Sequence, residues 1–120
     1  MERRFRLTRS TDIKRVRRVG KSYAHPLIVL LMAESDEEQE TRFGIVAGRS
    51  VGGAVQRNHA KRVIRESLRP LLSEITPGWD ILLLARHGMD GATFLKVHHA
   101  MAILLQRAHL IMTHDHVHQS

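Results

Sequence analysis

Residues 54–72 constrain the fold of this chain more than any other segment, because their polarity repeats with the period of a helix. At about 100° per residue, small and apolar side chains fall on one side of a helical wheel: Ala60, Val63, Ile64, Ser67, Leu68 and Leu71. The other side carries five cations and one amide: Arg57, Asn58, Lys61, Arg62, Arg65 and Arg69. Cations this close together repel one another unless a polyanion screens them. We therefore expect a helix that buries one side in a core and presents the other side to a polyanion.

The net charge of +7 is concentrated in two blocks of the sequence. Residues 1–21 hold nine basic and two acidic residues, and residues 49–69 hold six basic and one acidic. An acidic loop, residues 34–40, separates the two blocks. A solvated surface usually intersperses the two signs, whereas two basic blocks that meet in a fold form a site for phosphates. Nucleic acid is thus the favoured partner, with an anionic membrane and a plain solvated surface as the alternatives.

Length and composition exclude several classes of protein. A chain of 120 residues with 42% hydrophobic residues can bury one core, which excludes a disordered protein. The absence of cysteine excludes a disulfide scaffold and cysteine-ligated metal. The longest apolar run, residues 27–33, is too short to span a bilayer, and the basic N-terminal residues do not resemble a secretory signal. We expect a cytoplasmic protein with no membrane partner.

The rest of the chain predicts two further helices and three strands. A helix over residues 10–19 has Ser10-Thr11-Asp12 as its N-cap cluster and Gly20 at its end. Strands are expected over residues 27–33, 41–49 and 79–86, with Gly44 and Gly48 marking bulges, and the last helix over residues 90–112. The order is α-β-β-α-β-α, with a further short strand allowed for within residues 41–51. Residues 1–113 are expected to form one RNA-binding domain, and residues 114–120 a flexible, histidine-containing tail.

The loop before the basic helix, residues 48–53, is rich in glycine. Free backbone N–H groups and the helix dipole make such a junction attractive to phosphate, although glycines also serve ordinary tight turns. Asn58 is unfavourable inside a helix. Its amide can pair with a 2′-OH or a base edge, or it can bond locally to the backbone.

Side chains for catalysis or metal binding are not evident in the sequence. His114, His116 and His118 alternate and could chelate a metal, but a polar chain end is the simpler account. No His-Glu-x-x-His motif and no Ser/His/Asp arrangement occur. The carboxylates of residues 34–40 share a loop, where solvation explains them better than a two-metal site does. Trp79 begins an apolar strand and is interpreted as a core or rim anchor rather than a base-stacking platform.

Residues 49–66, Arg-Ser-Val-Gly-Gly-Ala-Val-Gln-Arg-Asn-His-Ala-Lys-Arg-Val-Ile-Arg-Glu, resemble the signature helix of the bacterial ribonuclease P protein component. That family carries a basic dipeptide, Val-Gly, then Arg-Asn-Arg, an apolar residue, Lys-Arg and Arg-Glu. The resemblance covers about residues 3–112. It includes Arg6-Leu-x-Arg9, Asp12, Phe43-Gly44, Gly78-Trp79-Asp80 and Ala85-Arg86.

The resemblance implies an α+β fold, with a central mixed sheet of about four strands and the order α-β-β-(β)-α-β-α. A left-handed β-α-β crossover would run through the basic helix. It also implies a protein subunit that binds the catalytic RNA of ribonuclease P and precursor tRNA, and assists removal of the tRNA 5′ leader. The holoenzyme would require Mg²⁺, while the protein alone would bind no cofactor and supply no catalytic side chain. The alternatives are a structural RNA-binding protein, such as a ribosomal component, and a stand-alone nuclease that uses histidines.

Two sets of site residues follow. The expected RNA-binding residues are Arg49, Arg57, Asn58, His59, Lys61, Arg62, Arg65 and Arg69. The expected residues of a cleft for the substrate leader are Arg9, Ile13, Arg17, Lys21, Ser22, Val29 and Leu31. His59 stands where the family has a third arginine, Ser50 replaces the second cation of the dipeptide, and Gly53 replaces a common Asn. Ile13 and Arg17 stand where the family has aromatic residues that stack on leader bases; a guanidinium can still stack, whereas Ile13 does so poorly.

Overall fold

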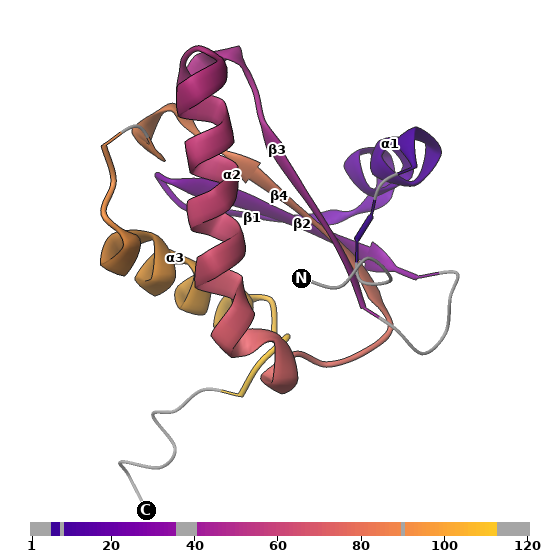
Figure 1. The fold of residues 1–120 in the computed structure, drawn as a ribbon. Helices are drawn as coiled ribbons and strands as arrows, with labels where there is room; N and C mark the ends of the chain where they lie inside the picture. Colours follow the sequence, from indigo (N-terminus) through magenta and orange to yellow (C-terminus); the bar gives the residue numbers. More distant parts are fainter. Residues whose placement is uncertain (1–5, 8, 36–40, 90, 113–120) are drawn as a thin grey trace, which may run out of the picture.

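Helices pack on both faces of a mixed β-sheet (Figure 1). The computed structural model describes residues 6–7, 9–35, 41–89 and 91–112. Within these ranges the order is α1 (Ser10–Val19), β1 (Lys21–Ala24), β2 (Ile28–Glu34), β3 (Arg42–Ala47), α2 (Ala54–Leu68), β4 (Trp79–Ala85) and α3 (Phe94–Arg107). The short 3-10 helices are η2 (Arg49–Val51), η3 (Arg69–Glu74) and η4 (His87–Met89). The predicted α+β class and the element order with its third strand are confirmed, and the tail predicted for residues 114–120 lies outside the described residues.

The strands lie in the order β1-β2-β4-β3. β1 and β4 each pair antiparallel with β2, whereas β3 pairs parallel with β4, and α2 crosses over between them. The additional strand is β1, so the prediction that placed it within residues 41–51 was wrong. Residues 25–27 close a tight turn in which the His25 N–H donates to the Ile28 carbonyl oxygen at 2.9 Å. This turn places the short strand β1 beside β2, at the edge of the sheet. As an edge strand, β1 has no pattern of apolar residues.

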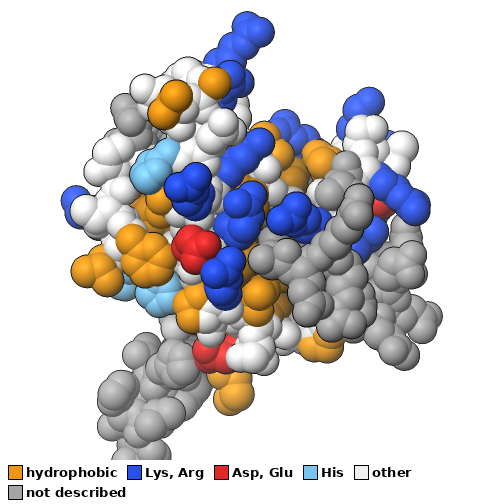
Figure 2. All heavy atoms as spheres, viewed as in Figure 1, with side chains coloured by type: hydrophobic (Ala, Val, Ile, Leu, Met, Phe, Trp, Pro, Cys, Tyr) orange, Lys and Arg blue, Asp and Glu red, His pale blue; other side chains and the backbone are white. Residues whose placement is uncertain are grey.

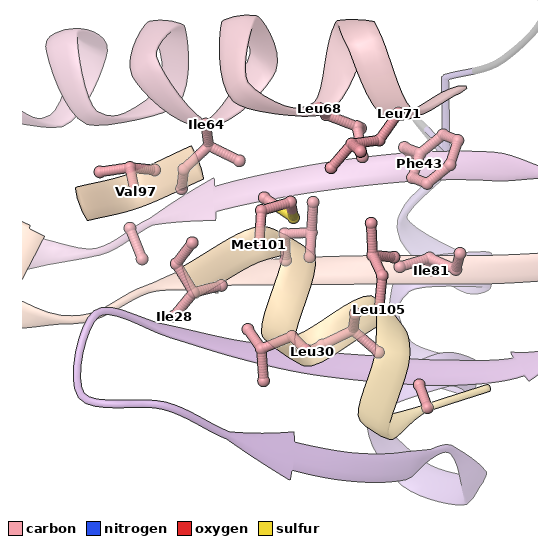
Figure 3. Packing of buried hydrophobic residues seen from close by; sticks show 14 of the residues in the cluster. Ile28, Leu30, Phe43, Ile64, Leu68, Leu71, Ile81, Val97, Met101 and Leu105 are labelled. Atoms are coloured by element: carbon pink, nitrogen blue, oxygen red, sulfur yellow. The ribbon is translucent and has the colours of Figure 1, made fainter. Parts of the chain in front are cut away.

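The sheet separates two apolar clusters. Side chains of β2 alternate between them: Ile28 and Leu30 face α2 and α3, while Leu31 and Ala33 face α1. Figure 3 shows the larger cluster, where Ile64 and Leu68 of α2 meet α3 and the strands. On the other face, the smaller cluster packs Val16 of α1 against the strands. These two layers fix which face of the sheet each helix covers.

Several predicted boundaries shift for local reasons. α2 ends at Leu68, because Pro70 follows and the chain tightens into the 3-10 helix η3. α3 begins at Phe94, because the Thr93 hydroxyl accepts the Lys96 N–H at 3.3 Å. The N-cap predicted at Ser10-Thr11-Asp12 was wrong: Ser10 is already helical, and Arg9 is the N-cap residue without a side-chain bond.

The prediction of bulges at Gly44 and Gly48 was wrong, because Gly44 lies in a regular part of β3 and Gly48 lies just after the end of that strand. Gly44 pairs in regular register with Leu82, and a Cβ there would lie 3.0 Å from the Leu82 Cδ1 and 3.1 Å from the Leu7 carbonyl oxygen. Gly20 ends α1 as predicted, but with φ of −72° rather than a left-handed conformation. A Cβ at Gly20 would collide with the carbonyl oxygen of Val16. Gly20 therefore has no room for a Cβ, whereas Gly44 has room for one only if its neighbours shift by a few tenths of an ångström.

Asp80, the second residue of β4, is fully buried and joins α1 and β3 to the centre of the sheet. Arg42 on β3 donates from Nε to its Oδ1 at 2.9 Å and from Nη2 to its Oδ2 at 2.8 Å. Arg15 on α1 donates to the same Oδ2 and, at 3.0 Å, to the Glu34 carbonyl oxygen. Asp12 Oδ2 lies 3.5 Å from the Arg42 Nη1, so two carboxylates face two guanidinium groups. The opposite charges balance, as a buried charge requires.

The variant Asp80→Asn should lower the free energy of unfolding by about 3 kcal/mol, because two guanidinium groups then lack their buried carboxylate. Asp12→Asn is the matched control, since Asp12 lies 3.5 Å from Arg42 and 3.9 Å from Arg15. This variant should lower the free energy of unfolding by only about 1 kcal/mol. Urea unfolding measures both values. Equal losses in the two variants would contradict the central role of Asp80.

The turn between β1 and β2 should make stability depend on pH. The His25 Nδ1 accepts the Leu27 N–H at 3.1 Å, which only a neutral ring can do. Burial, together with the charges of His99 and Arg107, lowers the pKa of His25 below 6.5. Because the folded pKa is below the unfolded one, this contribution to stability is complete above about pH 6.5 and is lost as pH falls through the folded pKa.

The variant His25→Asn keeps an acceptor for the Leu27 N–H but does not titrate. Between pH 7.5 and 5.5, about the range in which a histidine charges, its free energy of unfolding should fall less than that of the unmodified protein. The remaining histidines are common to both proteins, so the difference between the two curves reports His25 alone. Parallel curves would show that this turn has no such role.

Candidate nucleic-acid interface

A glycine turn leads the chain from η2 into α2. Gly52 has φ of +141°, a backbone conformation that favours glycine, and a Cβ there would lie 2.9 Å from the Gln56 Cβ. Gly53 is the N-cap residue and offers no side-chain acceptor to the first turn. The N-cap of α2 therefore makes no side-chain hydrogen bond to the first turn, and exposed Arg49 precedes it in η2.

The buried side and the basic side of α2 are those that the helical wheel predicts. Ala60, Ile64, Ser67 and Leu68 are buried against the sheet and α3. Four predicted RNA-binding residues of α2 and its end are exposed, and three are half-buried: Asn58, His59, Arg62 and Arg69, then Arg57, Lys61 and Arg65. Figure 2 shows Lys and Arg side chains gathered over α2 in the middle of one face. We call this set of residues the basic face of α2.

Most cations of the basic face have no acidic partner in the described part of the chain. Glu66 is the acidic residue of α2, and it pairs with Arg69 at 3.1 Å, where both side chains are about half exposed. No described carboxylate pairs with Arg57, Lys61, Arg62 or Arg65. The Nε atoms of Arg57 and Arg65 are buried, and no described residue accepts a hydrogen bond from them. The basic face thus holds positive charge that the described protein does not neutralise.

A pocket of about 150 Å³ lies between the basic face, β3 and the N-terminal segment. Arg6, Lys61 and Arg65 line it together with the backbone of β3. The N-terminal segment is held there because the Leu7 N–H donates to the Phe43 carbonyl oxygen at 2.7 Å. Three cations, with no acidic residue among the described lining residues, suit a phosphate group.

Arg6 is a site residue that the sequence analysis missed. The motif Arg6-Leu-x-Arg9 is part of the family resemblance, but its position outside the basic helix does not predict that Arg6 reaches Lys61 and Arg65. The signal that could have found it is the pairing of residue 6 with Phe43, which depends on the fold.

The face of the sheet that α1 covers holds part of the predicted leader cleft. Ile13, Val29 and Leu31 belong to one apolar cluster on this face. Ser22 pairs with Leu31 across the strands and therefore lies on the same face of the sheet. Leu31 is only 8% exposed, so most of its side chain is already covered. Arg9 and Arg17 are exposed, at the N-cap of α1 and on α1.

Lys21 does not join the other leader-cleft residues. It pairs with Met32, whose side chain packs in the cluster on the opposite face. Two residues that the prediction lacked do lie on the α1 face: Val46 and Leu84 are half-buried and sit beside Val29 across three strands. The strand pairing reveals this apolar row, which the order of residues in the sequence conceals.

The described residues hold neither a metal-binding cluster nor a membrane-spanning helix. No group of three or more His, Asp or Glu side chains in the described ranges is placed to hold a metal ion. Among those ranges, no helix combines the length and apolar character needed to cross a bilayer.

Comparison with known proteins agrees with the geometry. The model of the family described as Ribonuclease P matches residues 1–109. The ribonuclease P protein component of Herpetosiphon aurantiacus is 40% identical over 110 residues, which are 92% of this chain and 89% of that protein. The protein of that name from Mycobacterium sp. (strain KMS) is 37% identical, over 88% of this chain and 90% of its own length.

Solved structures show the same fold. The RNase P protein of Staphylococcus aureus superposes with a TM-score of 0.81 at 29% identity, covering 89% of this chain and 97% of that chain. The RNase P protein of Thermotoga maritima gives a TM-score of 0.76 at 30% identity, covering 85% and 96%. The family match over nearly the whole chain, the relatives and the shared fold lead to one conclusion: this chain belongs to the family of ribonuclease P protein components.

Proposed function

We propose that this chain binds the catalytic RNA of ribonuclease P through the basic face of α2 and precursor tRNA through the α1 face. In this role it assists the Mg²⁺-dependent removal of the tRNA 5′ leader. The observation that supports the proposal best is the unneutralised charge of α2 around a phosphate-sized pocket. The charge distribution alone would also fit a structural RNA-binding protein such as a ribosomal component, but the comparisons give that alternative no support.

The basic face favours RNA for electrostatic reasons. Each phosphate that it neutralises releases condensed counterions, and the mutual repulsion of the helical cations decreases at the same time. Arg65 and Lys61 meet Arg6 at the pocket, so one phosphate can contact two segments that are far apart in sequence. Exposed Asn58 and Arg62 extend the same surface toward sugars and further phosphates.

The α1 face suits a single strand of the substrate. Val29, Leu84 and Val46 form a half-buried apolar row next to α1, and Arg9 and Arg17 add positive charge. Bases can lie against such a row while phosphates face the arginines. In this proposal the protein supplies binding and charge neutralisation, and the RNA with its Mg²⁺ performs the hydrolysis.

The isolated protein should not cleave precursor tRNA, because the proposal places no catalytic side chain in it. Addition of ribonuclease P RNA at low Mg²⁺ concentration should produce cleavage at the 5′ leader junction. Gel analysis of end-labelled precursor tRNA measures both reactions. Robust cleavage by nuclease-treated, RNA-free protein would overturn the proposed role.

The two surfaces should serve different RNAs. Arg65→Gln should weaken assembly with the catalytic RNA and lower the slope of log affinity against log salt concentration by about one unit. Arg17→Gln should leave assembly unchanged and weaken precursor tRNA relative to mature tRNA. Filter binding over a salt series measures both equilibria.

Arg69→Gln is the matched control for Arg65→Gln. Arg69 lies at the end of the same helix but pairs with Glu66 at 3.1 Å, so its removal should change the assembly slope less. Equal effects of the Arg65 and Arg17 variants on both equilibria would refute the division between the surfaces.

A further inference from the structure

A second pocket, of about 690 Å³, lies at the edge of the sheet formed by β1. β3 and the basic face of α2 lie toward the other edge. The pocket opens where β2 ends and β4 begins, between the end of α1 and the turn after α3. Hydrogen bonds hold its walls, since the Thr76 N–H donates to the Leu110 carbonyl oxygen at 2.8 Å and the Ser35 N–H donates to that of Gly78 at 3.0 Å. It is therefore a preformed cavity large enough for a nucleotide.

The walls of this pocket are apolar and aromatic. Tyr23 of β1 and Trp79 of β4 both line it, and both side chains are half-buried, so each retains an accessible surface. Met32 and Leu110 are among the further apolar residues of the lining. The interpretation of Trp79 as a core anchor holds for the part of its side chain that packs on the larger cluster, while its other part faces the pocket. Two aromatic side chains around one cavity favour a planar ligand.

The rim of the pocket is polar and mostly basic. Lys21 is exposed and has no acidic partner among the described residues, and exposed His109 also lines the pocket. Arg15 also lines the pocket, but its charge is already compensated by Asp80. Glu34 adds one carboxylate, an acceptor that suits the amino groups of nucleobases. This combination fits a base and its phosphate better than an inorganic anion.

His109 occupies a position that favours glycine. Its φ is +58°, and it follows the end of α3, where its N–H donates to the Gln106 carbonyl oxygen at 3.0 Å and the Leu110 N–H donates to that of Leu105 at 2.9 Å. This is the helix-ending pattern in which glycine costs least. A histidine here lowers stability relative to glycine, and its side chain lines the pocket. Replacement of His109 by glycine should therefore raise stability, whereas it should weaken the binding of a ligand in the pocket.

We propose that this pocket binds one unpaired nucleotide of the substrate leader, with the base against Tyr23 and Trp79 and the phosphate toward Lys21 and His109. The assignment to the leader rests on the proposed function of the α1 face. Arg15 and Val19 of α1 line the pocket, so a strand that leaves the α1 face passes directly around the start of β1 into it. The catalytic RNA would bind the basic face of α2, toward the other edge of the sheet.

The test uses the protein assembled with ribonuclease P RNA and a series of precursor tRNAs whose leaders lengthen by one nucleotide at a time. Affinity for the unmodified protein should rise in two steps, the first as the leader covers the α1 face and the second as it reaches the pocket. Tyr23→Leu and His109→Gly should each abolish the second step, a loss of about tenfold, and keep the first. Lys21→Ser, at an exposed position, should reduce the second step without affecting folding.

Two controls separate binding from folding. Thermal unfolding should show that His109→Gly is at least as stable as the unmodified protein, so weaker binding cannot result from lost structure. Phe94→Leu removes another partly exposed aromatic residue, outside the pocket, and should leave both steps intact. Leader-length curves for Tyr23→Leu and His109→Gly that superimpose on the unmodified curve would overturn the proposal. Equal weakening of precursor and mature tRNA would also overturn it, whereas absence of the first step in the unmodified protein would refute the proposed function of the α1 face.

Discussion

The buried carboxylate of Asp80 is the interaction on which the arrangement of this protein depends. A charge with no solvent exposure is tolerated only where opposite charges surround it, and here Arg42 and Arg15 supply them. Arg42 belongs to β3 and Arg15 to α1, so one side chain fixes both elements relative to β4. Arg15 contacts Asp80 and also lines the pocket of about 690 Å³ at the β1 edge of the sheet, so it lies where this pocket meets the α1 face. Their relative position is thus set by the same ion pair.

This network also determines which arginines are available to RNA. Arg15 and Arg42 are cations in the sequence, yet their charges are neutralised by Asp80 and Asp12. The cations of α2 have the opposite arrangement, because no described carboxylate neutralises Arg57 or Arg65. Of Arg15 and Arg42, only Arg15 belongs to the first basic block, residues 1–21, which therefore uses part of its charge to hold the fold. The second block, residues 49–69, leaves most of its charge for a partner.

The parts of the fold that could be predicted are those that depend on local periodicity. The two sides of α2 follow from residues three and four apart, and Ile64 and Leu68 are buried as the wheel indicates. β1 could not be predicted in this way, because its burial pattern is that of an exposed edge and only the turn at His25 brings it to the sheet. The pairing of Asp80 with Arg15 joins residues 65 positions apart, and no pattern in the chain specifies that distance. Lys21 faces the side of the sheet opposite to the other leader-cleft residues, and Arg6 lines the pocket at α2. Both facts depend on strand pairing, so they appear only in the structure.

Gly44 shows how a residue that weakens a strand can create a binding site. Glycine inside a strand has no side chain to pack and loses more backbone entropy than other residues on folding. Any larger residue at this position would press against Leu82 and the backbone of Leu7, where a Cβ would already lie at 3.0 and 3.1 Å. The N-terminal segment would then have to shift by a few tenths of an ångström, and this segment carries Arg6, which lines the pocket with Lys61 and Arg65. The shape of the phosphate-sized pocket is therefore sensitive to the side chain at position 44 as well as to the cations that surround it.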